Sequence, residues 1–203
     1  MKPSPRETPN QFPQRAVHYQ GQGFLICPRC GAGVQAEAEH RTPLGGKCVG
    51  QPERVALGHE FVTDVLRVRF SRPPRSSAGS AGLLWFGYSL AYALLHGASE
   101  VVEVPLQDLS VTVRATAGDA VPEIILYDNV PGGAGLVARL ENPALFHQCL
   151  ESAQERIGGS CGCGEDSSCY GCLRTFANQF AHPWLARGPV LAYLGEVLAQ
   201  WKV

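Results

Sequence analysis

Seven of the chain's eight cysteines fall into two compact groups, and this clustering limits the possible folds more than any other feature. The first group has the pattern C-x2-C-x9-H-x7-C, made by Cys27, Cys30, His40 and Cys48. The second has the pattern C-x-C-x5-C-x2-C, made by Cys161, Cys163, Cys169 and Cys172. Closely spaced cysteines can point their thiolates at one ion, and four such ligands form the closed tetrahedral site of structural zinc. The sequence therefore predicts two zinc ions.

Three alternative interpretations of these groups have less support. Disulfides need an oxidising compartment, but the first residues lack the apolar segment of a secretion signal, which favours reduced thiols and a cytoplasmic location. Iron–sulfur ligation stays open for the all-cysteine group because thiolates also suit iron. His59 could replace His40 in the first group, since its spacing to Cys48 permits this. A closed site keeps no position for substrate, so structural roles are expected for both ions.

Composition excludes some classes of protein. The net charge is −1 and the sequence pI is about 6.6, so no global positive field attracts nucleic acid. No run of apolar residues is long enough to cross a bilayer, so we expect no membrane contact. The chain has 203 residues with 23 glycines and 15 prolines, which favours short elements joined by many turns over a long helical bundle.

The residue patterns predict three parts. Residues 1–22 are a flexible lead-in with almost no apolar pattern, and residues 23–52 form a zinc-ribbon-like module. Residues 53–203 form the main domain. We expect an α+β fold in which a mixed sheet packs on a buried central helix, with a small N-terminal zinc module and a C-terminal helical four-cysteine zinc site.

Individual elements of the main domain can be placed from periodicity. Strands are predicted in three segments: 62–70, 111–114 and 123–127. A helix over 81–96 is apolar nearly all round, which is typical of a buried helix, and Gly97 is its expected C-cap. Further helices are predicted at 143–157, around 172–180 and at 189–201.

Other candidate motifs favour structural roles. The loop Pro131-Gly-Gly-Ala-Gly135 follows a strand, but it matches neither common phosphate-binding pattern, so a tight turn is the better interpretation. His59, Glu60 and Asp64 lie close together without a complete set of catalytic partners, which makes a hydrolytic site the least favoured hypothesis. Cys149 is expected on the apolar face of a helix as a core residue.

The segment from Tyr127 to His182 resembles a known family. Its Tyr127–Leu136 loop and the pattern C-x-C-x5-C-Y-G-C-L-R-x-F-x-N-Q-x-x-H are similar to the C-terminal zinc-binding domain of MrfA-type superfamily 2 DNA helicases. The resemblance covers about residues 23–200, and the upstream part is closer to the branch that contains DrmB, a helicase-associated subunit of the DISARM anti-phage system. It implies that residues 53–203 are an MrfA-type zinc-binding domain whose zinc ligands are the four cysteines of the second group.

The resemblance also implies a function. The chain has no Walker motifs and no room for two motor lobes, so we expect either a fragment or a small protein whose motor is another chain. We therefore expect a non-catalytic zinc-binding accessory module or subunit of a superfamily 2 helicase complex. It would act in phage defence (DISARM-like) or DNA repair, and contact DNA through the complex. The alternative is a stand-alone zinc-dependent nucleic-acid-binding module, with phosphate contacts from Arg29, Arg41, Lys47, Arg174 and Arg187.

Overall fold

The computed structural model of the chain describes residues 24–34, 39–55, 61–75, 79–115 and 121–201. Contacts between residues divide the chain into two compact units, residues 1–61 and residues 62–203. The candidate residues His59 and Glu60 lie outside the described residues. Within the described ranges, no helix has both the length and the apolar character that a bilayer span requires.

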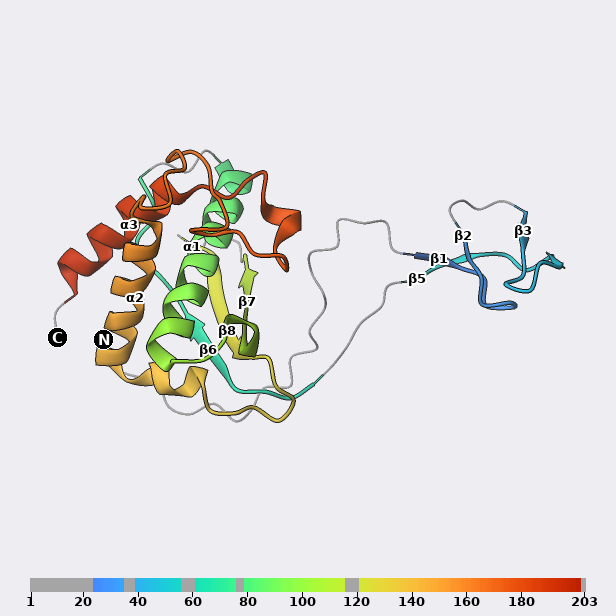
Figure 1. The fold of residues 1–203 in the computed structure, drawn as a ribbon, viewed down its shortest axis with the longest axis horizontal. Coiled ribbons are helices and arrows are strands. Elements are labelled where there is room, and N and C mark those ends of the chain that lie inside the picture. Colours follow the sequence, from blue (N-terminus) through green and yellow to red (C-terminus); the bar gives the residue numbers. More distant parts are fainter. Residues whose placement is uncertain (1–23, 35–38, 56–60, 76–78, 116–120, 202–203) are drawn as a thin grey trace. The chain divides into compact units, whose positions relative to one another are not determined.

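The first unit is built from very short strands (Figure 1). β1 (Phe24–Ile26) pairs antiparallel with both β2 (Gly33–Val34) and β5 (Glu53–Val55). A separate ribbon is formed by β3 (His40–Arg41) and β4 (Lys47–Cys48). Cys27 supplies the one buried hydrophobic side chain among the described residues of this unit. Such a module cannot be held by a hydrophobic core, so it depends on a cross-link.

The second unit contains a three-stranded antiparallel sheet in the order β6–β8–β7. Both β6 (Val65–Val68) and β7 (Leu109–Arg114) pair with the central strand β8 (Glu123–Asp128). Side chains alternate between the two faces of a strand, so Ile124 and Leu126 point together into the core and are fully buried. Ile125, on the other face, is half-buried.

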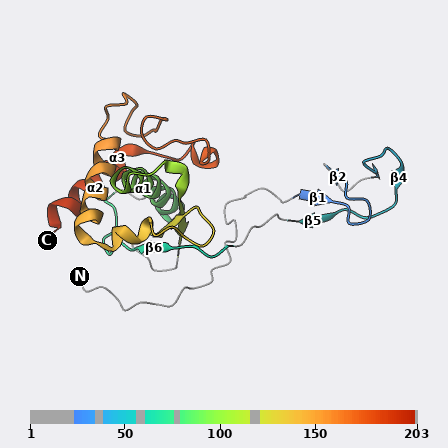
Figure 2. The same cartoon turned by 60° about the horizontal axis from the view of Figure 1, so that its bottom comes forward.

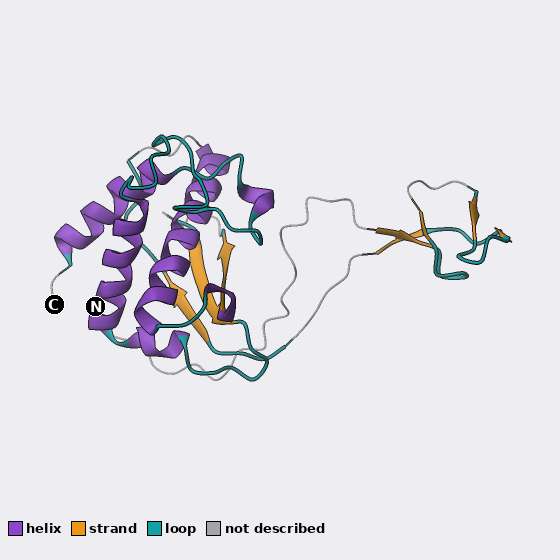
Figure 3. Ribbon diagram, viewed as in Figure 1, coloured by secondary structure: helices purple, strands orange, loops and turns teal. Residues whose placement is uncertain are grey.

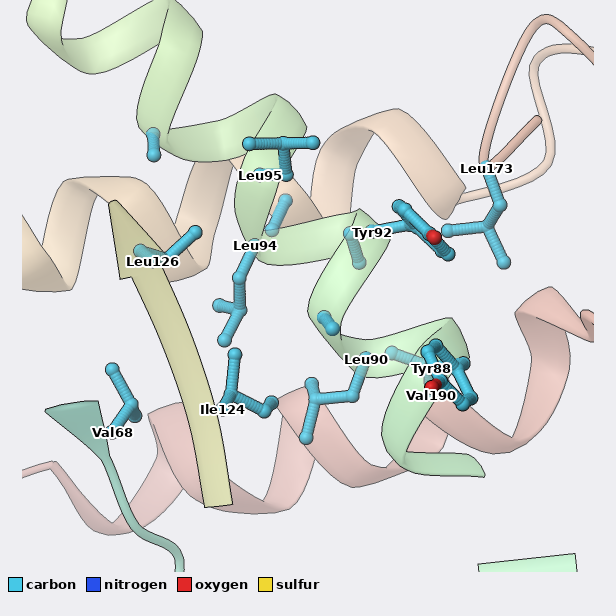
Figure 4. Close-up of a cluster of buried hydrophobic side chains, with 14 of the residues drawn as sticks. Val68, Tyr88, Leu90, Tyr92, Leu94, Leu95, Ile124, Leu126, Leu173 and Val190 are labelled. Carbon is cyan, nitrogen blue, oxygen red and sulfur yellow. The ribbon is translucent and has the colours of Figure 1, made fainter. Parts of the chain in front are cut away.

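Helix α1 (Gly79–Val102) is the centre of the second unit. Every residue from 86 to 98 is buried, which confirms the predicted central helix. The helix contacts the sheet on one side and α2 (Pro143–Ile157) on another, and α3 (Arg187–Gln200) packs beside α2 (Figure 3). Figure 4 shows Leu90 and Leu94 of α1 among the buried side chains that face β8. Three short 3-10 helices complete the unit: η1 (Leu106–Asp108), η2 (Val137–Glu141) and η3 (Gln179–Ala181).

The α+β class is confirmed, with corrections in detail. All described strand pairs are antiparallel, so the sheet is not mixed. Residues 172–180 form turns that lead into η3 instead of the predicted helix, because the hydrogen bonds there close around Cys169. Gly97 is not a C-cap, since α1 continues to Val102. A Cβ at Gly97 would overlap the carbonyl oxygen of Cys149 and lie 2.9 Å from the amide nitrogen of Ala153, so the glycine allows α1 and α2 to touch.

Candidate metal centres

The first cysteine group converges on one point of the first unit. One ligand atom from each of Cys27, Cys30, His40 and Cys48 lies within 4.8 Å of all the others. Antiparallel pairing of β3 with β4 sets His40 opposite Cys48, so the two side chains leave the ribbon on the same face. Cys27 and Cys30 sit in a turn closed by a 2.8 Å hydrogen bond from the Gly31 N–H to the Cys27 carbonyl. Gly31 has φ of +73°, a conformation that favours glycine.

The distances in this cluster suit a tetrahedral zinc ion. With Zn–S near 2.3 Å and Zn–N near 2.0 Å, two sulfurs are about 3.8 Å apart and a sulfur and a nitrogen about 3.5 Å. The Sγ atoms of Cys27 and Cys48 are 3.8 Å apart, and Cys30 Sγ is 3.3 Å from His40 Nε2. Gly50 makes room for this approach, because a Cβ there would lie 2.5 Å from Cys27 Sγ.

The second cysteine group converges in the loop between α2 and α3. One sulfur from each of Cys161, Cys163, Cys169 and Cys172 lies within 4.8 Å of the other three. The amides of residues 172, 173 and 174 all donate to the carbonyl oxygen of Cys169, which folds the chain tightly after it. Gly171 is required for the fit, since a Cβ there would lie 2.8 Å from the Cβ of Cys161.

Distances in the second cluster discriminate between the possible cross-links. Cys163 Sγ lies 3.4 Å from that of Cys161 and 3.7 Å from that of Cys172, which is 3.9 Å from Cys169 Sγ. A disulfide needs about 2.05 Å, and none of the eight cysteines forms one. Separations near 3.8 Å fit four ligands on one tetrahedral ion, whereas an iron–sulfur cluster spreads its thiolates over several metal atoms.

Hydrogen bonds favour the thiolate at one cysteine of each cluster. Burial raises the pKa of the Cys27 thiol, but the backbone N–H groups of Cys30 and Arg29 outweigh it and lower this pKa to about 6. The backbone of Cys163 lowers the pKa of Cys161 to about 7. Burial raises the pKa of Cys172 to about 12, so an arriving cation has to displace its proton.

Arg187, at the start of α3, ties the second cluster to the helices. Its side chain is buried and donates from Nε and Nη2 to the Cys163 carbonyl at 3.0 and 2.8 Å, and from Nη1 to the Ile157 carbonyl at 3.2 Å. Four thiolates around Zn²⁺ carry a formal charge of −2, so a buried guanidinium nearby offsets part of it. Arg187 was an expected phosphate contact. The structure corrects this, because its donors are occupied inside the fold.

The loop that carries the second cluster is also docked on α1. Trp184 stacks on Trp85 with ring centroids 4.3 Å apart, and the Ala186 N–H donates to Ser89 Oγ at 3.2 Å. Leu173, next to the last cysteine, is fully buried. This cluster therefore sits on an existing hydrophobic core, unlike the first.

The glycine-rich loop after β8 has no donors left for a phosphate among the amides of residues 132–137. The buried Asp128 carboxylate accepts from the N–H groups of residues 134, 136 and 137, at 2.8 to 2.9 Å. Asp64 accepts from the Gly135 N–H, and the amides of Gly132 and Gly133 bond to backbone carbonyls. The chain's own carboxylates occupy the anion-binding positions, as the tight-turn interpretation requires. Asp64 is thereby a structural residue of the loop.

Cys149 is a buried core residue, as predicted. Burial raises its pKa to about 12, and its thiol donates to the carbonyl of Leu94 in α1. It lies in neither ligand cluster.

Comparison with known proteins connects this geometry to one family. Residues 90–173 match the family model of the MrfA Zn-binding domain, and the match includes all four cysteines of the second cluster. This segment is therefore similar to an MrfA-type zinc-binding domain. Its presence, together with two four-ligand clusters, identifies zinc as the cofactor of the chain.

Two relatives illustrate the similarity. Druantia protein DruE from Escherichia coli (strain UMEA 4076-1) is 28% identical over 191 residues, which cover 81% of this chain and 10% of DruE. A crystal structure of the DUF1998 helicase MrfA bound to DNA has a TM-score of 0.54 at 20% identity, over 78% of this chain and 20% of MrfA. The chain thus spans about a tenth of DruE and a fifth of MrfA.

Sequence reasoning missed the residues that support the clusters. Arg187 gave no local signal, because its partners are carbonyl groups 24 and 30 residues away. Gly50 likewise gave no signal in the sequence, since the sulfur that it accommodates, Cys27 Sγ, belongs to a distant turn. Asp128 did carry a signal: an aspartate directly before a glycine-rich loop is placed to accept from the loop amides.

Proposed function

We propose that Cys27, Cys30, His40 and Cys48 bind one zinc ion and that Cys161, Cys163, Cys169 and Cys172 bind a second. Both ions would be structural, because all four positions of each tetrahedron are filled by side chains. Purified protein is then expected to contain about two zinc ions per chain. A content near one would remove the first site, and a content near zero would contradict both.

We further propose that the chain is a non-catalytic accessory module or subunit of a superfamily 2 DNA helicase complex. The match of residues 90–173 to the MrfA Zn-binding domain carries this proposal. It is supported by the glycine-rich loop, whose amides are bound to Asp64 and Asp128 and leave no phosphate site there. Zinc would hold the loop between α2 and α3 in one shape, as a rigid surface for the motor or for DNA.

We also propose a cellular role and a domain organisation. The chain would act in phage defence of the DISARM type or in DNA repair, in the cytoplasm, and reach DNA through the complex. Its organisation would be a lead-in (1–22), a zinc-ribbon-like module (23–52) and an MrfA-type domain (53–203). Because β5 pairs with β1, residues 53–55 are better assigned to the module.

Co-purification and activity assays test the accessory role. Tagged protein from the native host is expected to retain a superfamily 2 helicase, and adding the purified chain to that helicase is expected to change its ATP-dependent strand separation. The matched control is Cys169→Ser, which breaks the second cluster while leaving the first intact.

Two results would count against this role. Failure to retain any helicase or DNA-processing protein contradicts the accessory function. Hydrolysis of nucleotide or nucleic acid by the purified chain alone would show catalysis, and would revive the hydrolytic hypothesis for His59, Glu60 and Asp64.

The stand-alone nucleic-acid-binding function is the second candidate. Arg29, Arg41 and Lys47 are exposed on the first unit and suit phosphate contacts. Arg174 is less suited, because it donates to Ser168 Oγ and to the His182 carbonyl. Absence of DNA binding even at low salt would remove this candidate.

A further inference from the structure

One face of the β6–β8–β7 sheet is covered by the helices, and the other carries a cluster of arginines. Figure 2 shows β6 on one side of the second unit and the helices α1, α2 and α3 on the other. We call the side that faces away from these helices the outer face. Strand register places Glu123 opposite Arg114, and Ile125 opposite both Arg67 and Thr112, so these side chains all project from the outer face.

Three arginines surround a single carboxylate at one end of this face, where β8 begins. Arg67 Nε donates to Glu123 Oε1 at 3.0 Å and its Nη2 to Oε2 at 3.2 Å. Arg69 Nε lies 2.6 Å from Oε1, and Arg114 Nη2 lies 2.7 Å from Oε2. Burial raises the pKa of Glu123, but the hydrogen bonds from Arg67 and Arg69 outweigh it and keep this pKa low. The carboxylate therefore stays ionised, and the four side chains together carry a charge of +2.

Two of these arginines are accessible and have further donors. The side chains of Arg69 and Arg114 are 68% and 44% exposed, while that of Glu123 is 3% exposed. A guanidinium has five N–H donors, and the ion pairs with Glu123 engage Nε of Arg69 and Nη2 of Arg114. Glu123 thus holds both guanidinium groups in place, and their other N–H groups are not engaged by these ion pairs.

The positive charge is local. Residues 62–203 contain 13 acidic and 10 basic residues, so this unit as a whole is negative. Elsewhere in the unit, Arg75 pairs with Glu196 and Arg187 is buried. The outer face therefore stands out as a positive patch on an acidic unit.

We propose that the outer face of the β6–β8–β7 sheet binds the phosphate backbone of a nucleic acid through Arg69 and Arg114, held in position by Glu123. The proposal rests on the proposed function only for the choice of nucleic acid as the polyanion. Nucleic-acid interfaces are polar and strongly positive, whereas protein-docking surfaces have an apolar centre with aromatic anchors. The accessible side chains of this face, Arg69 and Arg114, belong to the ion cluster at the end where β8 begins. The half-buried Thr112 lies next to the cluster, opposite Ile125.

Fluorescence anisotropy with the full-length chain tests the proposal. The probes are a short labelled DNA duplex and the matching single strand. Counterion release makes one lost phosphate contact worth on the order of tenfold in affinity at about 50 mM salt. Arg69→Gln and Arg114→Gln should each weaken binding by about that factor, and the double variant by about 100-fold, with a shallower dependence on salt. Arg75→Gln is the matched control, because it removes the same charge from an exposed site on the loop that pairs with α3, and should have little effect.

A second variant separates phosphate binding from a merely structural role. Glu123→Gln keeps the shape of the side chain and an acceptor oxygen for the arginines while it removes the negative charge, so it should tighten DNA binding. Loss of a structural ion pair alone would not do that. Arg69→Lys with Arg114→Lys should retain most of the affinity, because the charge remains.

Three outcomes would overturn the proposal. The first is that the wild-type chain does not bind DNA at low salt. The second is that the double variant and Arg75→Gln bind DNA with equal affinity. The third is that the double variant keeps the wild-type affinity for DNA but no longer retains the helicase. The last would make the outer face a protein-docking surface. None of these outcomes bears on metal content or on helicase retention by the wild-type chain, so the proposed function is tested separately.

Discussion

The two zinc clusters have similar internal distances but very different surroundings. Around the first, Cys27 is the one buried hydrophobic side chain among the described residues of its unit. Around the second, Leu173, Ala181 and Leu185 are buried, and Trp184 stacks on the central helix. In the first unit the ion has to replace a hydrophobic core. In the second it orders a loop on a core that the helices and sheet already provide.

This difference means that equal ligand geometry does not imply equal dependence on metal. Metal-binding free energy is folding free energy where no site exists in the unfolded chain, and it reaches roughly 10–16 kcal/mol in small zinc peptides. A domain with its own core has about 5–15 kcal/mol from all sources. The first unit should therefore depend on zinc for its whole fold, and the second for one loop.

Removal of zinc should give the largest effect. A strong chelator is expected to unfold residues 24–55 completely, while α1 and the β6–β8–β7 sheet keep their structure, because the latter are held by apolar burial. Hydrogen exchange resolved by segment would measure this, and re-addition of zinc should restore protection. Unchanged protection of residues 24–55 would break the comparison, since it would mean that the first unit has another source of stability.

Cys169→Ser should have the next largest effect. The loss of one thiolate is expected to release the second ion and to loosen residues 158–186, whereas α3 stays protected because Val190 and Leu194 are fully buried. Limited proteolysis and thermal melting would follow both changes. Cys149→Ser is the matched control: it alters a buried cysteine outside the cluster, so it should lower stability without changing the zinc content. Full zinc retention by Cys169→Ser would contradict the assignment.

Gly97→Ala should destabilise the second unit alone. The added methyl group meets backbone atoms of α2 at residues 149 and 153, which cannot move aside as a side chain end could. The free energy of unfolding is expected to fall by about 3 kcal/mol, as for overpacked cores. Gly195→Ala is the control, since its methyl group meets the flexible end of Gln154, and a helical glycine replaced by alanine gains up to about 1 kcal/mol. Urea unfolding would measure both, and a weakened first zinc site in Gly97→Ala would contradict the independence of the units.

His96 should give the smallest effect, seen as a dependence on pH. Burial and the nearby Arg156 lower the pKa of His96 to about 4, below its ordinary value of 6.5. Above pH 6.5 the residue is neutral in both states. Between pH 6.5 and pH 4 the unfolded chain takes up a proton that the folded chain does not, so stability falls as the pH falls.

The measurement compares wild type with His96→Leu by urea unfolding at pH 7 and pH 5. A shift of 1.5 pH units below 6.5 corresponds to about 2 kcal/mol, which the wild type should lose in excess of the variant. Acid release of zinc affects both proteins equally and cancels in the difference. Equal losses in the two proteins would show that His96 is not buried neutral.

The sequence was most informative where the interactions are local. The spacing of Cys169 and Cys172 predicted a turn that closes around one ion, and alternation of Leu66 and Val68 with Arg67 predicted the two faces of β6. The apolar run over 81–96 predicted the central helix, because a helix that is apolar all round has no solvent face.

Predictions failed where a residue's environment comes from distant parts of the chain. Gly97 has the sequence context of a helix end, and only the approach of α2 explains it. The antiparallel register that brings Arg67 and Arg114 to Glu123 depends on two strand pairings, and the β6–β8 pairing joins residues more than 50 positions apart. Glu123 itself was included in an apolar strand, because no local pattern reveals that three cations will surround its carboxylate.

The pairing of β6 with β8 also sets the order in which the chain can fold during synthesis. Val65 pairs with Tyr127, so this residue of β6 has no strand partner until 62 more residues have been made. At roughly 5–20 residues per second, that wait is about 3–12 s. The turn that holds Cys27 and the strand that holds Cys48 are 21 residues apart and can meet about three times sooner. The metal-dependent module can therefore close first. Strand β6, which contains Arg67, stays unpaired for longer. An unpaired strand edge is prone to aggregate, so this is the stage at which the nascent chain most needs a chaperone.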